Sequence, residues 1–194
     1  EGGARIDRVD FKPFYDVAQM LYDGAWIAER YAAIECMMRD RPDAVHPVTR
    51  AIIAKAEAQS AVDAFNGFYR LADLRRACAP ILDATDMLCV PTIPTFATCA
   101  ELKADPVTPN SNLGSYTNFV NLLDLCALAV PTGPRSDGRP GGVTLIAPAG
   151  EDGAIAAQGQ RLTEARRPKL GATGIETPDL PNPGPAPLSG SEMT

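Results

Sequence analysis

Three short apolar stretches, each too brief for a stable helix, limit what this chain can fold into. They are Met87–Val90, Ala127–Val130 and Val143–Ala147, and the first two both run into Val-Pro-Thr. Short apolar runs bounded by proline are typical of buried strands. Longer stretches with apolar residues at three- and four-residue steps alternate with them. The alternation predicts an α/β fold with a sheet flanked by helices.

The longer stretches carry recognisable helix signals. Phe14–Met38 is predicted to be helical in two pieces that are interrupted at Gly24. Ser60 is a good N-cap, and Asp63 three residues later resembles the second half of a capping box. We expect Pro80 to bend or end the helix that Ser60 begins. The other expected elements are a short strand at 5–11, a helix from Pro47 to about Ala58, a loop at 97–113, and helices at 116–125 and 152–165.

Composition excludes several classes of function. The chain has 194 residues, which suits about one domain, and a net charge of −6 without a basic cluster, which argues against nucleic-acid binding. No apolar run approaches the ~20 residues that cross a bilayer. The five cysteines are scattered without metal-ligand spacing, which predicts reduced thiols in a cytoplasmic protein. We therefore expect no metal, no cofactor and no membrane partner.

The sequence changes character near its C-terminal end. Residues 167–194 are rich in proline and glycine and contain few large apolar side chains. Such a segment cannot bury enough apolar surface to offset the entropy of ordering. We therefore expect a folded domain at 1–166 and a disordered linker or tail at 167–194. Whether a second domain follows stays open.

One segment places chemistry-bearing side chains at regular intervals. Tyr22, Trp26 and Arg30 are four residues apart, so on a helix they would lie along one stripe. A guanidinium fits a carboxylate with two parallel hydrogen bonds, and a nearby phenol could hold the same anion. The alternative is an aromatic stripe in the core, with Arg30 reaching out to water.

This segment resembles a sequence block of allophanate hydrolases, a branch of the amidase signature family. The resemblance continues in order through most of the chain, roughly from residue 4 to 165. The matching blocks are Leu21–Tyr31, His46–Arg50, Ser60–Phe65, Tyr69–Leu71, Val90–Thr95, Asn110–Leu125 and Gly142–Leu145.

The resemblance implies a mixed sheet wrapped by helices and a Lys–Ser–Ser catalytic triad. The nucleophile of that family lies on a Gly/Ser-rich stretch before the matched blocks, and none of the serines here follows a glycine pair. We therefore expect this chain to be the C-terminal half of an amidase domain, with the N-terminal half as its partner. We assign it no catalytic residue. By itself it is expected to be inactive and poorly soluble, because half of a shared core would be exposed.

The resemblance also implies which residues bind substrate. Tyr22 and Arg30 match the positions that hold the carboxylate of allophanate. Thr117, Asn118 and Asn121 are polar residues in an apolar block, and they either face the substrate or satisfy backbone groups at a loop-to-helix junction. The single histidine, His46, precedes a helix-opening proline and is expected to have a structural role.

Three functions are compatible with the sequence. The first is part of an allophanate hydrolase that releases ammonia and carbon dioxide in urea or s-triazine breakdown. The second is an amidase for another small carboxylated amide. The third is a non-catalytic amidase-like subunit or scaffold. Homodimerisation is left open in each case.

Overall fold

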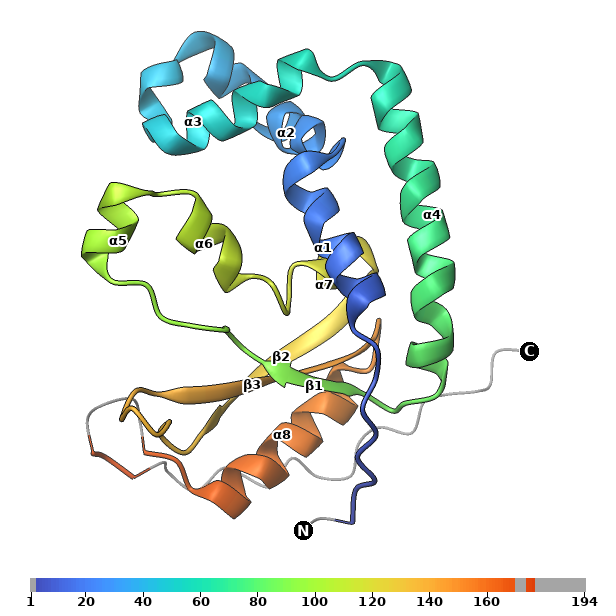
Figure 1. Ribbon diagram of the computed structural model, residues 1–194, viewed down its shortest axis with the longest axis vertical. Helices are drawn as coiled ribbons and strands as arrows, with labels where there is room; N and C mark the ends of the chain where they lie inside the picture. Colours follow the sequence, from blue (N-terminus) through green and yellow to red (C-terminus); the bar gives the residue numbers. More distant parts are fainter. Residues whose placement is uncertain (1–2, 170–173, 177–194) are drawn as a thin grey trace. The chain divides into compact units, whose positions relative to one another are not determined.

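A computed structural model describes residues 3–169 and 174–176 of the chain (Figure 1). These residues form two compact units. The first contains residues up to Thr85 together with Ile93–Asp124, and the second contains Asp86–Thr92 and the residues from Leu125 onward. The linker predicted at 167–194 lies mostly outside the described residues, so it stays a prediction.

The second unit is built on a three-stranded antiparallel sheet. Its strands are β1 (Leu88–Pro91), β2 (Leu125–Thr132) and β3 (Gly141–Pro148), in the order β1-β3-β2. The three strands predicted from the short apolar stretches are found, and the α/β class is confirmed. Both strand pairs among the described residues are antiparallel. Because β3 lies between β1 and β2, it forms hydrogen bonds on both of its edges.

Helix α8 (Asp152–Arg166) packs against this sheet, as Figure 1 shows, and matches the predicted final helix. The core between them contains Val130, Leu145, Ala147 and Ile155, all nearly inaccessible to solvent. Burying a side chain of this size is worth about 1.5–3 kcal/mol. The unit is therefore held together by one apolar layer between helix and sheet.

The Val-Pro-Thr sequence after β1 has a structural use in this unit. Thr144 on β3 is buried, and its hydroxyl donates to the Thr92 hydroxyl at 3.1 Å. A buried hydroxyl without a partner would be costly, so Thr92 relieves that cost at the end of β1.

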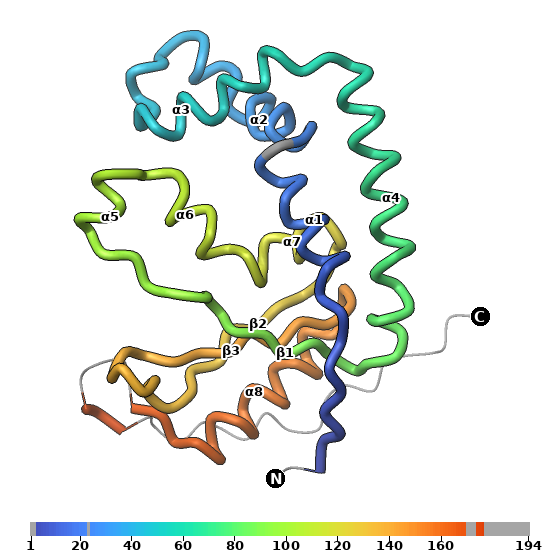
Figure 2. The backbone as a smooth tube through the Cα atoms, viewed as in Figure 1, coloured from blue at the N-terminus to red at the C-terminus, as the bar shows by residue number. Residues whose placement is uncertain are grey.

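The first unit is helical, and its chain path can be followed in Figure 2. Helices α1 (Lys12–Asp23) and α2 (Trp26–Asp40) meet at Gly24, as predicted. Helix α7 (Phe119–Leu122) lies beside α1, although about a hundred residues separate them in sequence. The aromatic rings of Phe14 on α1 and Phe119 on α7 are fully buried and 4.9 Å apart, so they form the centre of this unit.

Helix α4 (Ala61–Asp83) begins with the predicted capping box. The Ser60 hydroxyl accepts from the Asp63 N–H at 3.1 Å, and the Asp63 carboxylate accepts from the Ser60 N–H at 2.9 Å. Leu71 and Cys78 are seven residues apart, so they lie on one face of the helix, and both are buried. The helix continues for three residues after Pro80, so proline does not end it there, and the alternative that proline bends it stays a prediction. Proline removes only one backbone donor, so the helix can continue past it.

Other boundaries also differ from the sequence-based expectation. Residues 5–11 form no strand, because no described strand pairs with them. The Ile6 side chain in this segment is 89% exposed. The expected loop at 97–113 contains helices α5 (Cys99–Ala104) and α6 (Thr108–Leu113). A second capping box, formed by Thr98 and Glu101, starts α5.

Two expected helices are shorter in the structure. The helix expected to run from Pro47 to Ala58 is α3 (Pro47–Ile53) followed by 3₁₀ turns at Ala54–Ala58. The helix expected at 116–125 is reduced to α7, preceded by turns. In both cases a periodic pattern marked the helix correctly and overestimated its length.

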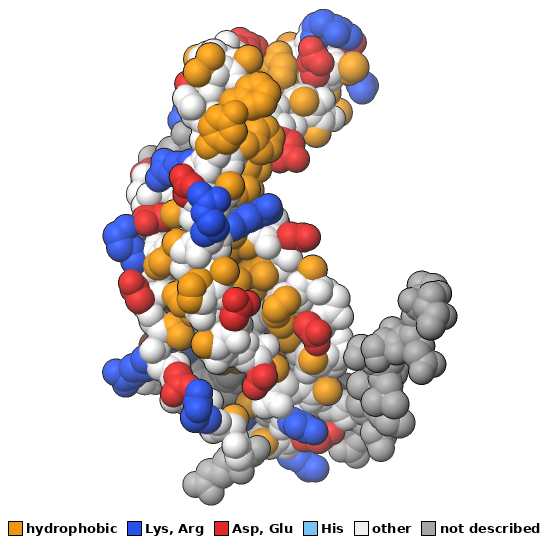
Figure 3. Space-filling model, turned by 90° about the vertical axis from the view of Figure 1, so that its right-hand side faces the viewer, with side chains coloured by type: hydrophobic (Ala, Val, Ile, Leu, Met, Phe, Trp, Pro, Cys, Tyr) orange, Lys and Arg blue, Asp and Glu red, His pale blue; other side chains and the backbone are white. Residues whose placement is uncertain are grey.

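The start of α4 carries an exposed apolar face. Val62, Phe65, Phe68 and Tyr69 are each between 61% and 67% exposed. Figure 3 shows apolar side chains gathered in a patch over the side of the molecule where α4 lies. None of the described helices combines the length and apolar character needed to span a bilayer.

Ser60→Ala should destabilise the first unit by about 1 kcal/mol, because it leaves the Asp63 N–H without its acceptor. Denaturant unfolding of the chain measures this loss. Ser136→Ala, which changes an exposed loop serine, is the matched control and should have little effect. Equal stabilities of the two variants would contradict the capping role.

Native Cys78 should resist alkylation at pH 8. Burial, assisted by the negative charge of Asp16, raises the pKa of its thiol to about 11. Only about one thiol in a thousand would then be ionised, and the thiolate is the nucleophile. Timed labelling followed by peptide mass spectrometry should show the exposed Cys36 modified far earlier. Similar labelling rates in the native chain would contradict the burial of Cys78.

Candidate functional site

Tyr22 and Arg30 lie against each other at the junction of α1 and α2. The guanidinium carbon of Arg30 is 5.6 Å from the centroid of the Tyr22 ring and lies over its face. Both side chains are half-buried. The helical segment is interrupted at Gly24, as predicted, yet the two side chains still meet. Contact with the ring stabilises a cation while its N–H groups remain available to an anion.

Asn118 joins this pair from the other end of the sequence. Its side-chain amide donates to the Tyr22 hydroxyl at 3.2 Å. Asn118 occupies the N-cap position of α7 but makes no capping hydrogen bond with its side chain. Of the two roles considered for Asn118, backbone capping is therefore wrong. Its amide fixes the orientation of the Tyr22 hydroxyl.

The turn before α7 holds Asn118 in place. The Gly114 carbonyl accepts from the N–H groups of Thr117 and Asn118, at 3.0 and 2.9 Å. A side chain at Gly114 would overlap with the Asn118 amide, so this position requires glycine for space. Thr117 thus contributes its backbone to the turn that orients Asn118.

A depression of about 480 Å³ lies next to Arg30. Its polar lining consists of Arg30, Glu29, Asn121 and Arg75, and Trp26 and Phe68 contribute aromatic walls. The depression therefore has two guanidinium groups and one carboxylate. No ion pair joins Arg30 or Arg75 to a carboxylate among the side chains that the structure describes. This balance of charge favours a small anionic ligand.

The structure thus brings together four of the five predicted binding residues. Tyr22, Arg30 and Asn118 form one contact series, and Asn121 lines the depression beside Arg30. Thr117 is not among the lining residues.

Arg75 was missed by the sequence analysis. It lies on α4, on the helix face that contains Leu71 and Cys78. A charged residue on an otherwise apolar helix face was the sequence signal that could have identified it.

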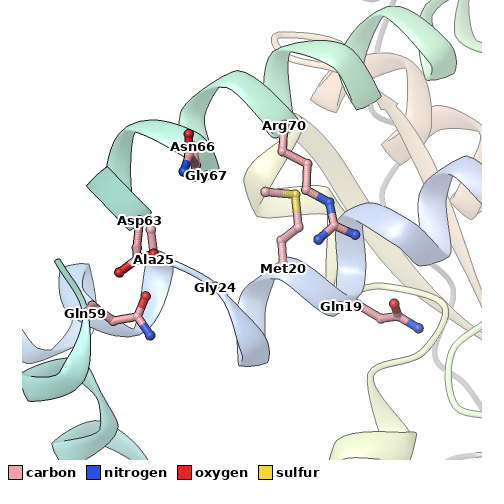
Figure 4. A pocket seen from close by; sticks show the side chains of 9 residues that line it. All are labelled: Gln19, Met20, Gly24, Ala25, Gln59, Asp63, Asn66, Gly67 and Arg70. Carbon is pink, nitrogen blue, oxygen red and sulfur yellow. The ribbon is translucent and has the colours of Figure 1, made fainter. Parts of the chain in front are cut away.

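A second, smaller depression of about 280 Å³ lies between the α1–α2 junction and the start of α4 (Figure 4). Gly67 allows this close approach, because a Cβ there would be 3.0 Å from the Ala25 side chain. None of the predicted binding residues lines it, and its Asp63 already serves the capping box. We therefore assign it no role in the site.

His46 occupies the N-cap position of α3. Its side chain is exposed and makes no capping hydrogen bond, so the structural role expected for it stays a prediction. The nearby Arg50 pairs with Asp43 at 2.7 Å, which joins α3 to the 3₁₀ turn before it.

Tyr22→Phe and Asn118→Ala should be coupled in stability. Each substitution breaks the same side-chain hydrogen bond, so their combined cost should fall short of the sum by about 1 kcal/mol. Unfolding free energies of the two single variants and the double variant measure this coupling. Strict additivity would show that the hydrogen bond does not form in solution.

Comparison with known proteins places the chain in a family. A model of the amidase family matches residues 2–155. Over 146 residues the chain is 43% identical to urea amidolyase of Saccharomyces cerevisiae and 44% identical to that of Lachancea kluyveri. Each alignment covers 74% of this chain and 8% of the relative.

The fold has a close counterpart among solved structures. Allophanate hydrolase of Kluyveromyces lactis superposes with a TM-score of 0.80 at 40% identity. The match covers 86% of this chain and 28% of that protein, so the chain spans about a quarter of the length of this relative. The family predicted from the sequence blocks is confirmed: the chain belongs to the amidase family.

Proposed function

We propose that this chain is part of an amidase that hydrolyses allophanate to ammonia and carbon dioxide, and that it supplies the binding of the substrate carboxylate. The similarity to urea amidolyase and to allophanate hydrolase supports an allophanate-hydrolysing enzyme. The contact series of Arg30, Tyr22 and Asn118 supports the assignment of the carboxylate to this part of the domain.

The observation that carries the proposal is the unpaired state of Arg30 among the described residues. Its side chain is half-buried, its guanidinium lies over the face of Tyr22, and it forms no ion pair with a described carboxylate. A partly desolvated cation without an anionic partner is unfavourable, so a bound carboxylate would relieve it. The depression beside it has room for a small anion.

Tyr22 adds a directed donor. Its hydroxyl oxygen accepts a hydrogen bond from Asn118, so its own proton remains free to be donated. A carboxylate bound to the Arg30 guanidinium can also accept a hydrogen bond from the Tyr22 hydroxyl. The two groups together would fix both the charge and the orientation of the acid.

This arrangement explains why the substrate should be an acid. Allophanate is urea that carries a carboxylate. A neutral amide in the same place would leave the guanidinium without its anion, so it would be bound less well. Arg30 is thus proposed to select substrates that carry a negative charge, while other residues bind the amide that is hydrolysed.

The bond-breaking step is proposed to use the N-terminal half of the amidase domain. A serine hydroxyl from that half would attack the terminal amide carbonyl, the C–N bond would break, and ammonia would leave. Backbone N–H groups would stabilise the tetrahedral intermediate, and water would release the acyl group. The residues of this chain would hold the substrate's other end still during both steps.

The cellular setting is also a proposal. All five cysteines are free thiols in the structure. Unpaired thiols persist in a reducing compartment, which supports a cytoplasmic enzyme of nitrogen metabolism.

Arg30→Ala in the full-length enzyme should reduce kcat/KM for allophanate by about 100-fold, because the substrate charge loses its partner. Biuret, in which a neutral amide replaces the carboxylate, should lose less than about threefold. Arg39→Ala removes the same charge from an exposed position on the same helix and is the matched control. Steady-state kinetics with both substrates measure these effects.

Equal losses on allophanate and biuret would reject the carboxylate role of Arg30. Unchanged turnover of both would place the carboxylate elsewhere in the enzyme.

A further inference from the structure

We propose that Arg75 is a positioning residue for the carboxylate site: it holds the C-terminal end of α7 so that Asn118 stays in contact with Tyr22. The inference rests on the proposed function, since it concerns the same site. Arg75 belongs to α4, whereas the pair that it serves belongs to α1 and α2.

The first observation is the bond itself. The Arg75 guanidinium donates to the Leu122 carbonyl at 2.7 Å across 47 residues of sequence, and this hydrogen bond is partly buried. Leu122 is the last residue of α7. The final carbonyls of a helix have no partner within it, and a cation is favourable at that end. Arg75 thus satisfies a group that α7 cannot satisfy itself.

The second observation is the shortness of α7. The helix has four residues, so its own hydrogen bonds cannot keep it in place. Packing of Phe119 against Phe14 and Phe11, at ring distances of 4.9 and 5.5 Å, anchors its first turn on α1. Arg75 anchors its other end on α4. A short helix with two anchors has a defined orientation, and losing one would let it rotate.

The third observation is what α7 carries. Asn118 immediately precedes the helix and donates to Tyr22, and Asn121 lines the depression beside Arg30. Arg75 lines the same depression. A rotation of α7 would therefore move both asparagines relative to the guanidinium of Arg30. The bond from Arg75 keeps the two halves of the binding site in register.

The test compares three substitutions of Arg75 in the full-length enzyme. Arg75→Met keeps the length without a donor, Arg75→Gln keeps a neutral donor, and Arg75→Lys keeps the charge. Arg76→Met is the matched control, because Arg76 is the next residue on α4 and pairs with Asp73 on the surface. Each variant is assayed for kcat and KM with allophanate and with biuret. Hydrogen–deuterium exchange is followed in the peptide that covers residues 114–123.

Arg75→Met should raise KM for allophanate about tenfold with little change in kcat, because an interaction that holds the bound acid is weakened. Biuret kinetics should stay within about twofold, because biuret lacks the acid. Exchange in residues 114–123 should increase in Arg75→Met only, and Arg75→Gln should restore both KM and protection. Arg76→Met should resemble the unchanged enzyme.

Two results would overturn the inference. Rescue by Arg75→Lys but not by Arg75→Gln would show that the charge of Arg75 acts on the substrate directly. Unchanged exchange in residues 114–123 of Arg75→Met would show that Arg75 does not hold α7. The second result is independent of substrate, so it separates this inference from the proposed function, which Arg30→Ala tests with allophanate and biuret.

Discussion

The hydrogen bond from Asn118 to Tyr22 is the interaction on which the proposed site depends. It joins the end of α1 to the start of α7 across 96 residues of sequence. Around it, Gly114 leaves space for the amide, Arg30 covers the phenol ring, and α7 packs its apolar side on α1. A single polar contact in a partly buried place thus aligns three separate stretches of chain.

The contact between Arg30 and the Tyr22 ring suggests how a protein can stabilise a guanidinium and still leave it available to bind an anion. A salt bridge within the protein would satisfy Arg30 but would compete with substrate. An aromatic face stabilises the guanidinium more weakly and does not occupy its N–H groups. Tyr22 can therefore support Arg30 from one side while its hydroxyl addresses the same ligand. The proposed double use would account for a tyrosine, and not a phenylalanine, at this position.

Local signals predicted much of the fold. The capping box of Ser60 and Asp63 and the break at Gly24 were readable because each depends on neighbours in sequence. The three paired strands were readable because each is a short apolar run. The helix α5 carried an equally local signal in Thr98 and Glu101, and it was overlooked. The absence of a strand at 5–11 was not readable, since a strand exists only where a partner pairs with it.

The site was less predictable than the fold for the same reason. Tyr22 and Arg30 were found because they share one sequence block, and the resemblance pointed to their role. Their contact with Asn118, and the bond from Arg75 to Leu122, depend on how distant helices pack. Spacing along the chain carries no information on such contacts. Only the position of Arg75 on the same helix face as Leu71 and Cys78 hinted that it lies near a neighbouring helix.

Trp26 gives this arrangement an optical consequence. It is the only tryptophan of the chain, it lines the depression beside Arg30, and its ring lies 5.8 Å from that of Phe68. Indole emission responds to nearby charge and to displacement of water. The chain therefore contains an intrinsic fluorophore beside the depression proposed to bind an anion, so its emission spectrum should change on binding without any attached dye.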